Sequence, residues 1–445
     1  MKIRQLLSLL VALALFAAAC GSTTDAVSDA AGDVADDVAD VVADDEDEAM
    51  EDEEEAMEDE EEAMEDDDAA PATSGLDIDA ILAADLDNCA AAPTGDAIQV
   101  GMALDFSEVT GFVDIPGSQL GPFVAEKINC SGGIDGAPVE VRVAEVGDDA
   151  ALATQELLDW GAHFLVGPPF ADFTLPVLQT TGGQVPVFVA ASTEPTLSDS
   201  SINSFLVTFD DFGMSEAAAQ FALDQGRTRA IIFTEGEGVP YTGVNPDAFA
   251  AHFTANGGEI VSTQTYIWGA DTDFSAQVNE IAGVADGTEV VFSAMLGFQL
   301  TALRGQLEGQ GLDGLLYGGT DALDATGIQF EANNEGIFHT PHTSITPGDR
   351  IDTLLADFEA ANGEALESRG FMALYADAIF LGIQGIIDCG CTDSAEIGAA
   401  VANISGFQGL SGEITYAGTT GTPPKAVPIN QIVDGEDVLV ATIGG

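Results

Sequence analysis

The stretch 120–174 most constrains what this chain can fold into, because helical and strand patterns alternate along it. Apolar side chains recur at helical spacing over 120–128, and a Gly-rich turn over 129–136 ends that helix. Valines alternate with charged residues over 139–143, as in a half-buried strand. A second helical pattern leads to an apolar strand over 163–168. Alternating helices and strands predict a parallel sheet with helices on both of its faces.

Further strand patterns come before and after this stretch. In the first part of the chain, apolar runs of strand length cover 98–104, 185–189 and 204–207. A second series of strands alternates with helical stretches and predicts a second lobe; these strands are 230–234, 260–266, 289–293 and 315–317. The whole pattern predicts an α/β protein with two Rossmann-like lobes.

The last third of the chain is predicted to contribute elements to both lobes. Residues 337–339 should cross back to the first lobe, where the long apolar stretch 371–387 is predicted to form a core helix. Strand patterns at 412–416 and 427–441 then return the chain to the second lobe. No stretch after the N-terminus approaches the ~18 consecutive apolar residues that a membrane helix needs.

The first twenty residues resemble an export signal. Two basic residues precede an apolar core over 6–16 that is too short to span a bilayer comfortably. Residues 17–22 read Ala-Ala-Ala-Cys-Gly-Ser and resemble a bacterial lipoprotein cleavage site. We therefore expect residues 1–19 to be a lipoprotein signal peptide and Cys20 to carry the lipid. The alternative is ordinary secretion, with cleavage near the same point.

An acidic region follows this signal. Asp and Glu dominate residues 25–68, where a seven-residue unit beginning Ala-Met-Glu nearly repeats. A period of seven is typical of coiled coils, but charges of one sign along the whole unit repel one another. We predict a disordered acidic tether over 20–75, which would hold the folded part, 76–445, away from the membrane.

The acidic character extends to the rest of the chain. There are 77 Asp and Glu against ten Lys and Arg, which gives a formal net charge of −67. Such a surface repels nucleic acid and anionic membranes, so nucleic acid is excluded as a partner and membrane contact is expected through the lipid alone.

The cysteines suggest disulfides. If Cys20 is lipidated, four cysteines remain, and an even number in an exported protein indicates two disulfides. We favour a Cys89–Cys130 bond, which would fix the N-terminal segment to the end of the first helix. Cys389 and Cys391 would then form a tight local ring, near the geometric limit for bridging. A zinc site is the alternative, but a lone Cys-x-Cys is a weak signal for zinc.

Five blocks carry a resemblance to a known family. The chain reads Ile-Asn followed by Gly-Gly-Ile-x-Gly-x-Pro-Val-Glu over 128–140; the other blocks are 157–168, 187–195, 271–275 and 406–412. In this order they resemble the extracellular solute-binding proteins of ABC importers, most of all the branched-chain amino-acid (Leu/Ile/Val-binding) type. The resemblance covers roughly residues 97–441.

The resemblance implies the type I periplasmic-binding fold. Two α/β lobes with parallel sheets would be joined by a three-crossover hinge and would close over a small solute. The implied lobe boundaries are about 97–208 and 340–405 for lobe 1, and about 209–339 and 406–445 for lobe 2.

The same resemblance assigns ligand roles to two loops of the first lobe. The loop after the strand at 163–168 would meet the ligand's carboxylate, and here Phe170, Ala171 and Phe173 replace the more usual small hydroxyl residues. These residues suggest an apolar or aromatic contact, although each Phe could instead pack in the core. A second loop would hold the head group of the ligand, or could merely cap the next turn; its residues are Ala191, Ser192 and Thr193.

Three residues of the second lobe receive ligand roles in the same way. Tyr241 matches an aromatic residue that stacks on the ligand, and Met295 would line the cleft where a Tyr is often found. Asp321 matches an acid that pairs with the ligand's ammonium group; the alternative is that it caps a helix.

Signals of catalysis and of metal binding are absent from the sequence. There is no nucleophile elbow, P-loop or His-Glu-x-x-His motif. His339 and His342 flank Pro341, which breaks the helix that would align two imidazoles on a metal. We expect no cofactor and no enzyme activity. The predicted function is extracytoplasmic capture of an amino-acid-like solute for an ABC permease; the alternatives are a signalling receptor of the same fold or a secreted enzyme.

Overall fold

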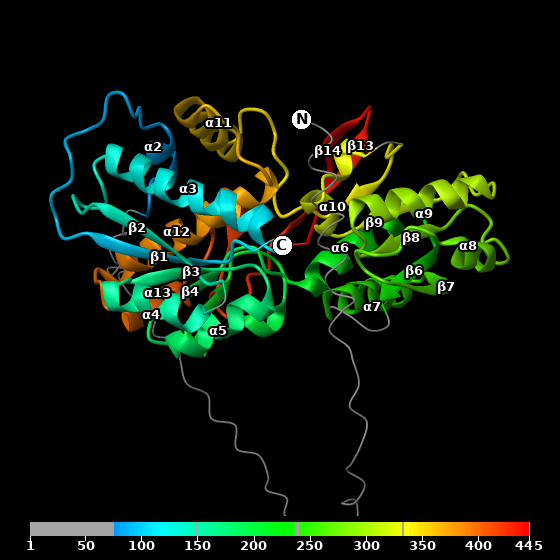
Figure 1. Ribbon diagram of the computed structural model, residues 1–445, viewed down its shortest axis with the longest axis horizontal. Helices are drawn as coiled ribbons and strands as arrows, with labels where there is room; N and C mark the ends of the chain where they lie inside the picture. The colour runs from blue at the N-terminus through cyan, green and yellow to red at the C-terminus, as the bar shows by residue number, and fades with distance from the viewer. Residues whose placement is uncertain (1–74, 108, 148, 236–239, 332, 445) are drawn as a thin grey trace, which may run out of the picture. The chain divides into compact units, whose positions relative to one another are not determined.

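The computed structural model describes residues 75–444, except for 108, 148, 236–239 and 332. The predicted signal peptide, Cys20 and all but the last residue of the predicted tether lie outside the described residues. Helices alternate with strands along the described chain, and the strands form two large sheets (Figure 1). The predicted α/β class with two lobes is therefore confirmed.

The first sheet is parallel throughout, and its strands run in the order β2-β1-β3-β4-β5. The strands are β1 (Ile98–Leu104), β2 (Val139–Glu145), β3 (Phe164–Gly167), β4 (Val187–Val189) and β5 (Ser204–Leu206). All five strands predicted in this part of the chain are confirmed.

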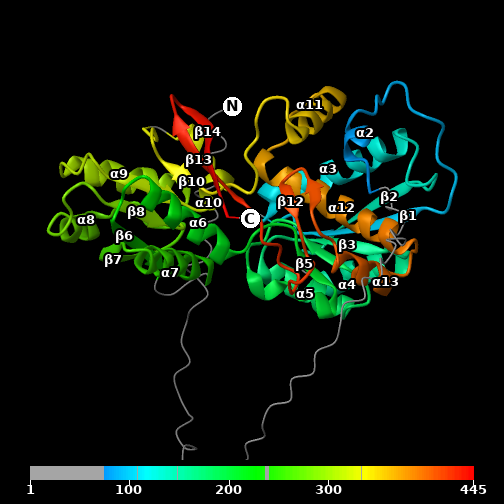
Figure 2. The same cartoon turned by 180° about the vertical axis from the view of Figure 1, so that it is seen from behind.

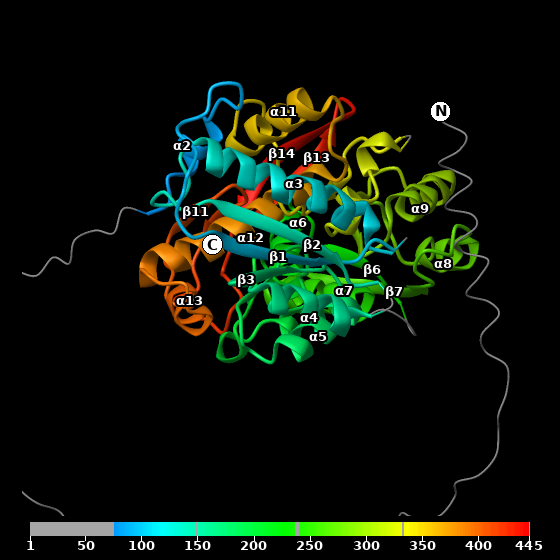
Figure 3. The same cartoon turned by 60° about the vertical axis from the view of Figure 1, so that its left-hand side comes forward.

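Helices cover both faces of this sheet. One face carries α3 (Gly111–Cys130) and α12 (Arg369–Cys389), and α3 runs along β1 and β2 (Figure 3). The other face carries α4 (Ala150–Trp160) and α5 (Ala171–Thr181). Because successive side chains of a strand point to opposite faces, Met102 belongs to the core beneath the first pair and Ala103 to the core beneath the second.

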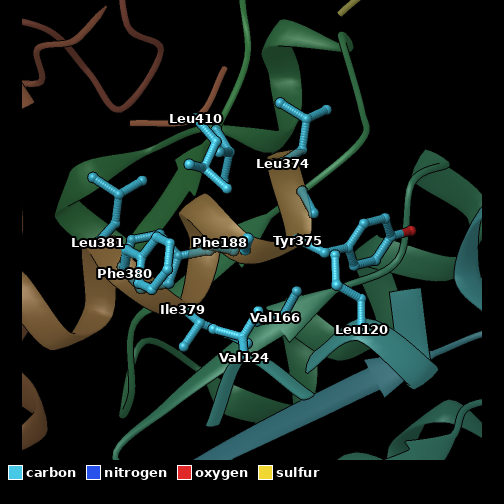
Figure 4. Packing of buried hydrophobic residues seen from close by; sticks show 14 of the residues in the cluster. Leu120, Val124, Val166, Phe188, Leu374, Tyr375, Ile379, Phe380, Leu381 and Leu410 are labelled. Atoms are coloured by element: carbon cyan, nitrogen blue, oxygen red, sulfur yellow. The ribbon is translucent and has the colours of Figure 1, made fainter. Parts of the chain in front are cut away.

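Helix α12 is the centre of the first lobe. It is the one helix in the described ranges that is long and apolar enough to cross a membrane, and 94% of its most apolar window is buried inside the protein. Its side chains Tyr375 and Ile379 pack with Leu120 and Val124 of α3 (Figure 4). The predicted core helix is therefore confirmed.

Smaller elements complete the first lobe. They are α2 (Ile78–Leu82), α11 (Arg350–Asn362), α13 (Ser394–Val401), the 3-10 helices Pro195–Leu197 and Ser200–Ile202, and the hairpin β11 (Phe407–Gly409) and β12 (Gly412–Ile414). The hairpin lies against α12, since Leu410 and Ile414 belong to the same core.

The second sheet has seven strands in the order β14-β13-β10-β9-β8-β6-β7. Their bounds are β6 (Arg229–Glu235), β7 (Glu259–Tyr266), β8 (Val290–Ser293), β9 (Leu316–Gly319), β10 (Phe338–His339), β13 (Val427–Val433) and β14 (Glu436–Ile443). The strands predicted for the second lobe are confirmed. Strands β6 to β10 are parallel, but β13 pairs antiparallel with β10 and with β14 (Figure 2).

The antiparallel pair refines the prediction of parallel sheets. Asp434 and Gly435 alone connect β13 to β14, and both have positive φ angles of 54° and 80°. Two such residues make a tight hairpin turn, whereas a parallel connection needs a crossover of a dozen residues or more.

Helices also cover both faces of the second sheet. They are α6 (Asp211–Asp224) and α7 (Pro240–Ala255) on one face, α8 (Ser275–Ile281) and α9 (Gly297–Gly309) on the other, and the short α10 (Ala322–Ala325) and 3-10 helix Ile328–Phe330 after β9. Neighbouring strand residues again separate, with Ile232 in one core and Phe233 in the other.

The described chain passes between the two sheets three times: after β5, after β10, and between β12 and β13. The third passage begins only after residues 407–416, which pack on the core of the first lobe. The side chains of Leu410, Ile414 and Tyr416 are buried in that core.

Two disulfides close loops of the first lobe. Cys89 bonds to Cys130 at the end of α3, as predicted, with 4.5 Å between the Cα atoms. Cys389 bonds to Cys391 beyond the end of α12, and their Cα atoms are 5.2 Å apart. Both Cα distances lie within the usual range for disulfides.

Candidate functional site

The loop between β3 and α5 presents the start of a helix at the carboxyl end of the first sheet. Phe170 is the N-cap residue of α5. Its side chain makes no cap hydrogen bond and so satisfies none of the free N–H groups of the first helical turn. Free N–H groups at a helix start suit an anion such as a carboxylate. Phe170 is 38% exposed, whereas Ala171 is half-buried.

The loop after β4 contributes three buried residues. Ala191, Ser192 and Thr193 are all buried. The Ser192 hydroxyl accepts a hydrogen bond from the Glu194 N–H at 3.2 Å, which fixes the turn. The Thr193 hydroxyl instead donates to Asp211 Oδ1 at 2.6 Å. Thr193 therefore reaches a residue of the second lobe and does not merely cap its own turn.

Asp211 is a site residue that the sequence analysis missed. It is the first residue of α6 and only 1% exposed, and its Oδ1 also accepts a hydrogen bond from Asn245 Nδ2 at 3.1 Å. Burial raises the pKa of the Asp211 carboxyl to about 7; the hydrogen bonds from Thr193 and Asn245 oppose this rise, and the nearby charges of Asp321 and Glu194 add to it. A carboxyl group near neutral pKa in this place can exist in either protonation state at physiological pH.

Tyr241 and Asp321 come together from two loops at the carboxyl edge of the second sheet. The Tyr241 hydroxyl donates to Asp321 Oδ1 and lies 2.6 Å from the Thr320 hydroxyl. Burial, followed by the charge of Asp321, raises the pKa of Tyr241 well above its usual value, so the phenol stays protonated and donates. Asp321 precedes α10 but its side chain makes no cap hydrogen bond. The Asp321 side chain therefore contacts this group of residues and does not cap its own helix.

His342 completes this group, and it too was missed as a site residue. Its Nε2 lies 3.0 Å from Asp321 Oδ2, and its Nδ1 lies 3.0 Å from the Thr208 hydroxyl. The imidazole is only 1% exposed and packs between two aromatic rings, with centroid distances of 5.4 Å to Phe209 and 4.7 Å to Phe371. A histidine that follows a strand end in a chain with four histidines was the available signal.

The family model for a periplasmic binding protein matches residues 97–437. This chain belongs to the periplasmic binding protein family. Among curated proteins, none matches the sequence.

Solved structures show the same fold for this periplasmic binding protein at low sequence identity. The branched-chain amino-acid transporter substrate-binding protein LivJ from Streptococcus pneumoniae, in complex with isoleucine, is 19% identical with a TM-score of 0.63, over 79% of this chain and 100% of that chain. The leucine-binding protein LivK from Thermotoga maritima is 21% identical with a TM-score of 0.61, over 78% and 98%. A solute-binding protein from R. palustris, in complex with benzoate, is 18% identical with a TM-score of 0.58, over 78% and 96%.

One of the predicted site residues, Met295, lies apart from this group. Met295 has no exposed surface and packs in the core beneath α8 and α9, while the following Leu296 is half-buried. Met295 is four residues after Val291, so their side chains point to the same face of the sheet and enter the same core. Phe173 is half-buried on the first turn of α5.

No cluster of three or more metal-ligating side chains occurs among the residues that the structure describes. His339 and His342 take separate partners, since His339 Nε2 lies 3.0 Å from Asp437 Oδ1. The polar groups of the site are thus suited to bind a small polar molecule by hydrogen bonds and charge.

Proposed function

We propose that this protein is a lipid-anchored extracytoplasmic solute-binding protein that captures an amino acid or a related small amide and delivers it to an ABC permease. The observation that carries the proposal is the Thr193–Asp211 hydrogen bond together with the Tyr241–Asp321 pair. These contacts place polar side chains of both lobes at the carboxyl edges of two sheets, where open α/β proteins bind ligands.

The two lobes offer complementary chemistry for such a solute. In the first lobe, the start of α5 and the hydroxyl of Ser192 suit a carboxylate, and Thr193 holds the adjacent Asp211. In the second lobe, Tyr241 and Asp321 suit a donor group such as an ammonium. We assign the apolar part of the solute to Phe170 and Phe173, with Ala171 and Ala191 as small neighbours and Met295 behind the second-lobe loop.

The proposed mechanism is closure of the two lobes around the solute. A solute that bridges both lobes interacts more strongly with the closed form and shifts the population toward it. The three passages of the chain between the sheets act as the hinge. The permease then receives the solute from the closed form. No step of this cycle requires a cofactor or a covalent reaction.

The proposed location rests on the N-terminal sequence. Cys20 would carry the lipid, and residues 20–75 would tether the folded part to the outer face of the cell membrane. Metabolic labelling with palmitate tests this assignment. The wild-type chain should be labelled and the Cys20→Ala variant should not; equal labelling of both would refute the anchor without affecting the solute-binding proposal.

A thermal-shift screen of the full chain tests the solute-binding function. The panel contains the common amino acids, their amides and small aromatic acids, because the similar solved proteins hold isoleucine or benzoate. A ligand at 100 times its Kd stabilises the folded state by about 2.7 kcal/mol, which is a measurable rise in Tm. A rise with an amino acid or amide supports the proposal, whereas turnover of a bound solute or no rise with any compound contradicts it.

A further inference from the structure

Both oxygens of the Asp321 carboxylate already have a partner inside the protein. Oδ1 accepts the hydrogen bond from the Tyr241 hydroxyl, and Oδ2 lies 3.0 Å from His342 Nε2. Asp321 is 8% exposed, so its negative charge is largely removed from water and needs a compensating positive or donor group. The imidazole of His342 therefore lies where it can compensate this charge from within the protein.

The imidazole is held in this position from several sides. The Thr208 hydroxyl lies 3.0 Å from Nδ1, the ring of Phe209 stacks on it at an interplanar angle of 22°, and the ring of Phe371 meets its edge at 72°. These three residues belong to the first passage between the sheets and to α12. Because the ring is buried and packed against two aromatic rings, it cannot leave Asp321 by a simple rotamer change.

The Nε2 atom retains hydrogen-bonding capacity. Its approach to Asp321 is at ion-pair distance but is not aligned as a hydrogen bond, and Nε2 has no aligned partner among the described residues. A buried donor of this kind is stabilised by an additional acceptor. A carbonyl oxygen of a solute would supply one, whereas an ammonium group would not.

We propose that His342 is a specificity-determining residue, which compensates Asp321 from within the protein and lets the site accept small carboxylates that lack an α-ammonium group as well as amino acids. This inference rests on the proposed solute-binding function and names the solute class of the same site. A solute ammonium competes with an internal partner of Asp321, so it adds little net affinity. A carboxylate solute without an ammonium group leaves the Asp321–His342 pair intact.

A purely structural role for the pair predicts a different result. In that case, substitution of His342 would lower Tm and weaken all solutes by the same factor. Specificity is a difference between two affinities, so the ratio of Kd values for matched solutes separates the two roles. Suitable pairs are leucine with 4-methylpentanoate, phenylalanine with 3-phenylpropanoate, and isoleucine with 3-methylpentanoate, because each second compound lacks only the ammonium group.

The test is calorimetric titration of these pairs into the full chain and into His342→Gln. Wild-type protein should bind both members of a pair within about tenfold of each other, and His342→Gln should shift the ratio at least about tenfold toward the amino acid. The matched control is His252→Gln on α7, where His252 contacts Gln220 at 3.2 Å and not the site; its ratio should equal that of the wild type.

Four results would overturn the inference. A wild-type preference of more than about 100-fold for the amino acid would show that the ammonium group is required. An unchanged ratio in folded His342→Gln would leave only the structural role. If that variant does not fold, Asp321→Asn decides: a ratio that stays within about tenfold supports the inference, and selective loss of amino-acid binding contradicts it. If no pair binds to wild type, the proposed function fails together with the inference.

Discussion

The hydroxyl of Thr193 donates a 2.6 Å hydrogen bond to the buried carboxyl of Asp211, and this bond links the loop after β4 to the first turn of α6. In Thr193→Val, Asp211 keeps only the Asn245 amide on the same oxygen. Loss of one partner from a buried polar group should lower the free energy of unfolding by about 1–3 kcal/mol. Urea unfolding measures this change.

The control for that variant is Thr196→Val in the same loop. Thr196 is exposed and its hydroxyl donates to Glu194. Its removal should change the free energy of unfolding by less than about 0.5 kcal/mol. Equal losses in the two variants would mean that the Thr193–Asp211 bond contributes nothing specific.

A buried lysine connects the first lobe to the third passage of the chain. Lys425 is 6% exposed and donates to the Ser411 hydroxyl and to the Val207 carbonyl, while Ser411 also donates to Asp377. Burial lowers the pKa of Lys425 to about 8 and raises that of Asp377, and each charge partly offsets the shift of the other.

Lys425→Met should therefore leave Asp377 as an uncompensated buried acid. The free energy of unfolding at pH 7 should fall by about 3–5 kcal/mol, as measured by urea unfolding. The double variant Lys425→Met/Asp377→Asn should recover part of this loss. Arg369→Met is the control, because Arg369 and Asp352 form a partly exposed ion pair worth about 1 kcal/mol or less. A loss in Lys425→Met no larger than in the control would contradict the buried network.

The stability of the protein should fall as pH rises from acid to weakly alkaline values. Burial raises the pKa of Asp114 from its ordinary value of 3.8 to about 8, although Tyr375 and Asp105 donate hydrogen bonds to the carboxyl. Between these two values the folded chain keeps a proton that the unfolded chain loses. The stabilisation from this group is therefore complete below about pH 4 and is lost as pH rises through about 8.

The measurement is urea unfolding of wild type and Asp114→Asn between pH 5 and pH 8. One extra proton in the folded state corresponds to a slope of about −1.4 kcal/mol per pH unit. In Asp114→Asn, the slope of the free energy of unfolding against pH should be less negative than in wild type, by up to about 1.4 kcal/mol per pH unit. The slope of the variant should still be negative, because burial also raises the pKa of Asp211 to about 7 and that of Asp324 to about 6. Parallel pH profiles for the two proteins would show that Asp114 is ionised in the folded state.

The two disulfides should contribute unequally to stability. Cys89 and Cys130 are separated by 41 residues in sequence and Cys389 and Cys391 by two. Because the entropy lost by the unfolded chain grows with the closed loop, removal of the first bond by double Ser substitution should cost about 4 kcal/mol and removal of the second only about 1 kcal/mol. Chemical denaturation of the two variants measures both values, and a larger cost for the Cys389–Cys391 pair would contradict this model.

Much of the fold could be predicted because its strands are regular and its loops follow from them. Alternating valines in β2 and apolar runs in β3 and β8 mark strands by composition and length alone. The antiparallel pairing of β13 and β14 could have been predicted only if Asp434 and Gly435 had been recognised as a hairpin turn. The position of β11 and β12 on α12 depends on tertiary contacts that no local pattern carries.

The site could be predicted only in part, for a physical reason. Thr193, Tyr241 and Asp321 follow strands, so their places at the sheet edges follow from the order of elements. Asp211 and His342 take their roles from contacts across more than fifteen residues of sequence, Asp211 with Thr193 and His342 with Asp321. Such partners can be identified only from the three-dimensional arrangement of the two lobes.

The most direct test of the central claim is hydrogen–deuterium exchange of the full chain, with and without a solute identified in the thermal-shift screen. Closure on a solute between the lobes should protect the amides of residues 167–174 and 190–195 in the first lobe and of 240–245 and 319–323 in the second, all in the same titration. Protection confined to one lobe, or to segments away from these four loops, would contradict capture of a solute by closure at this site.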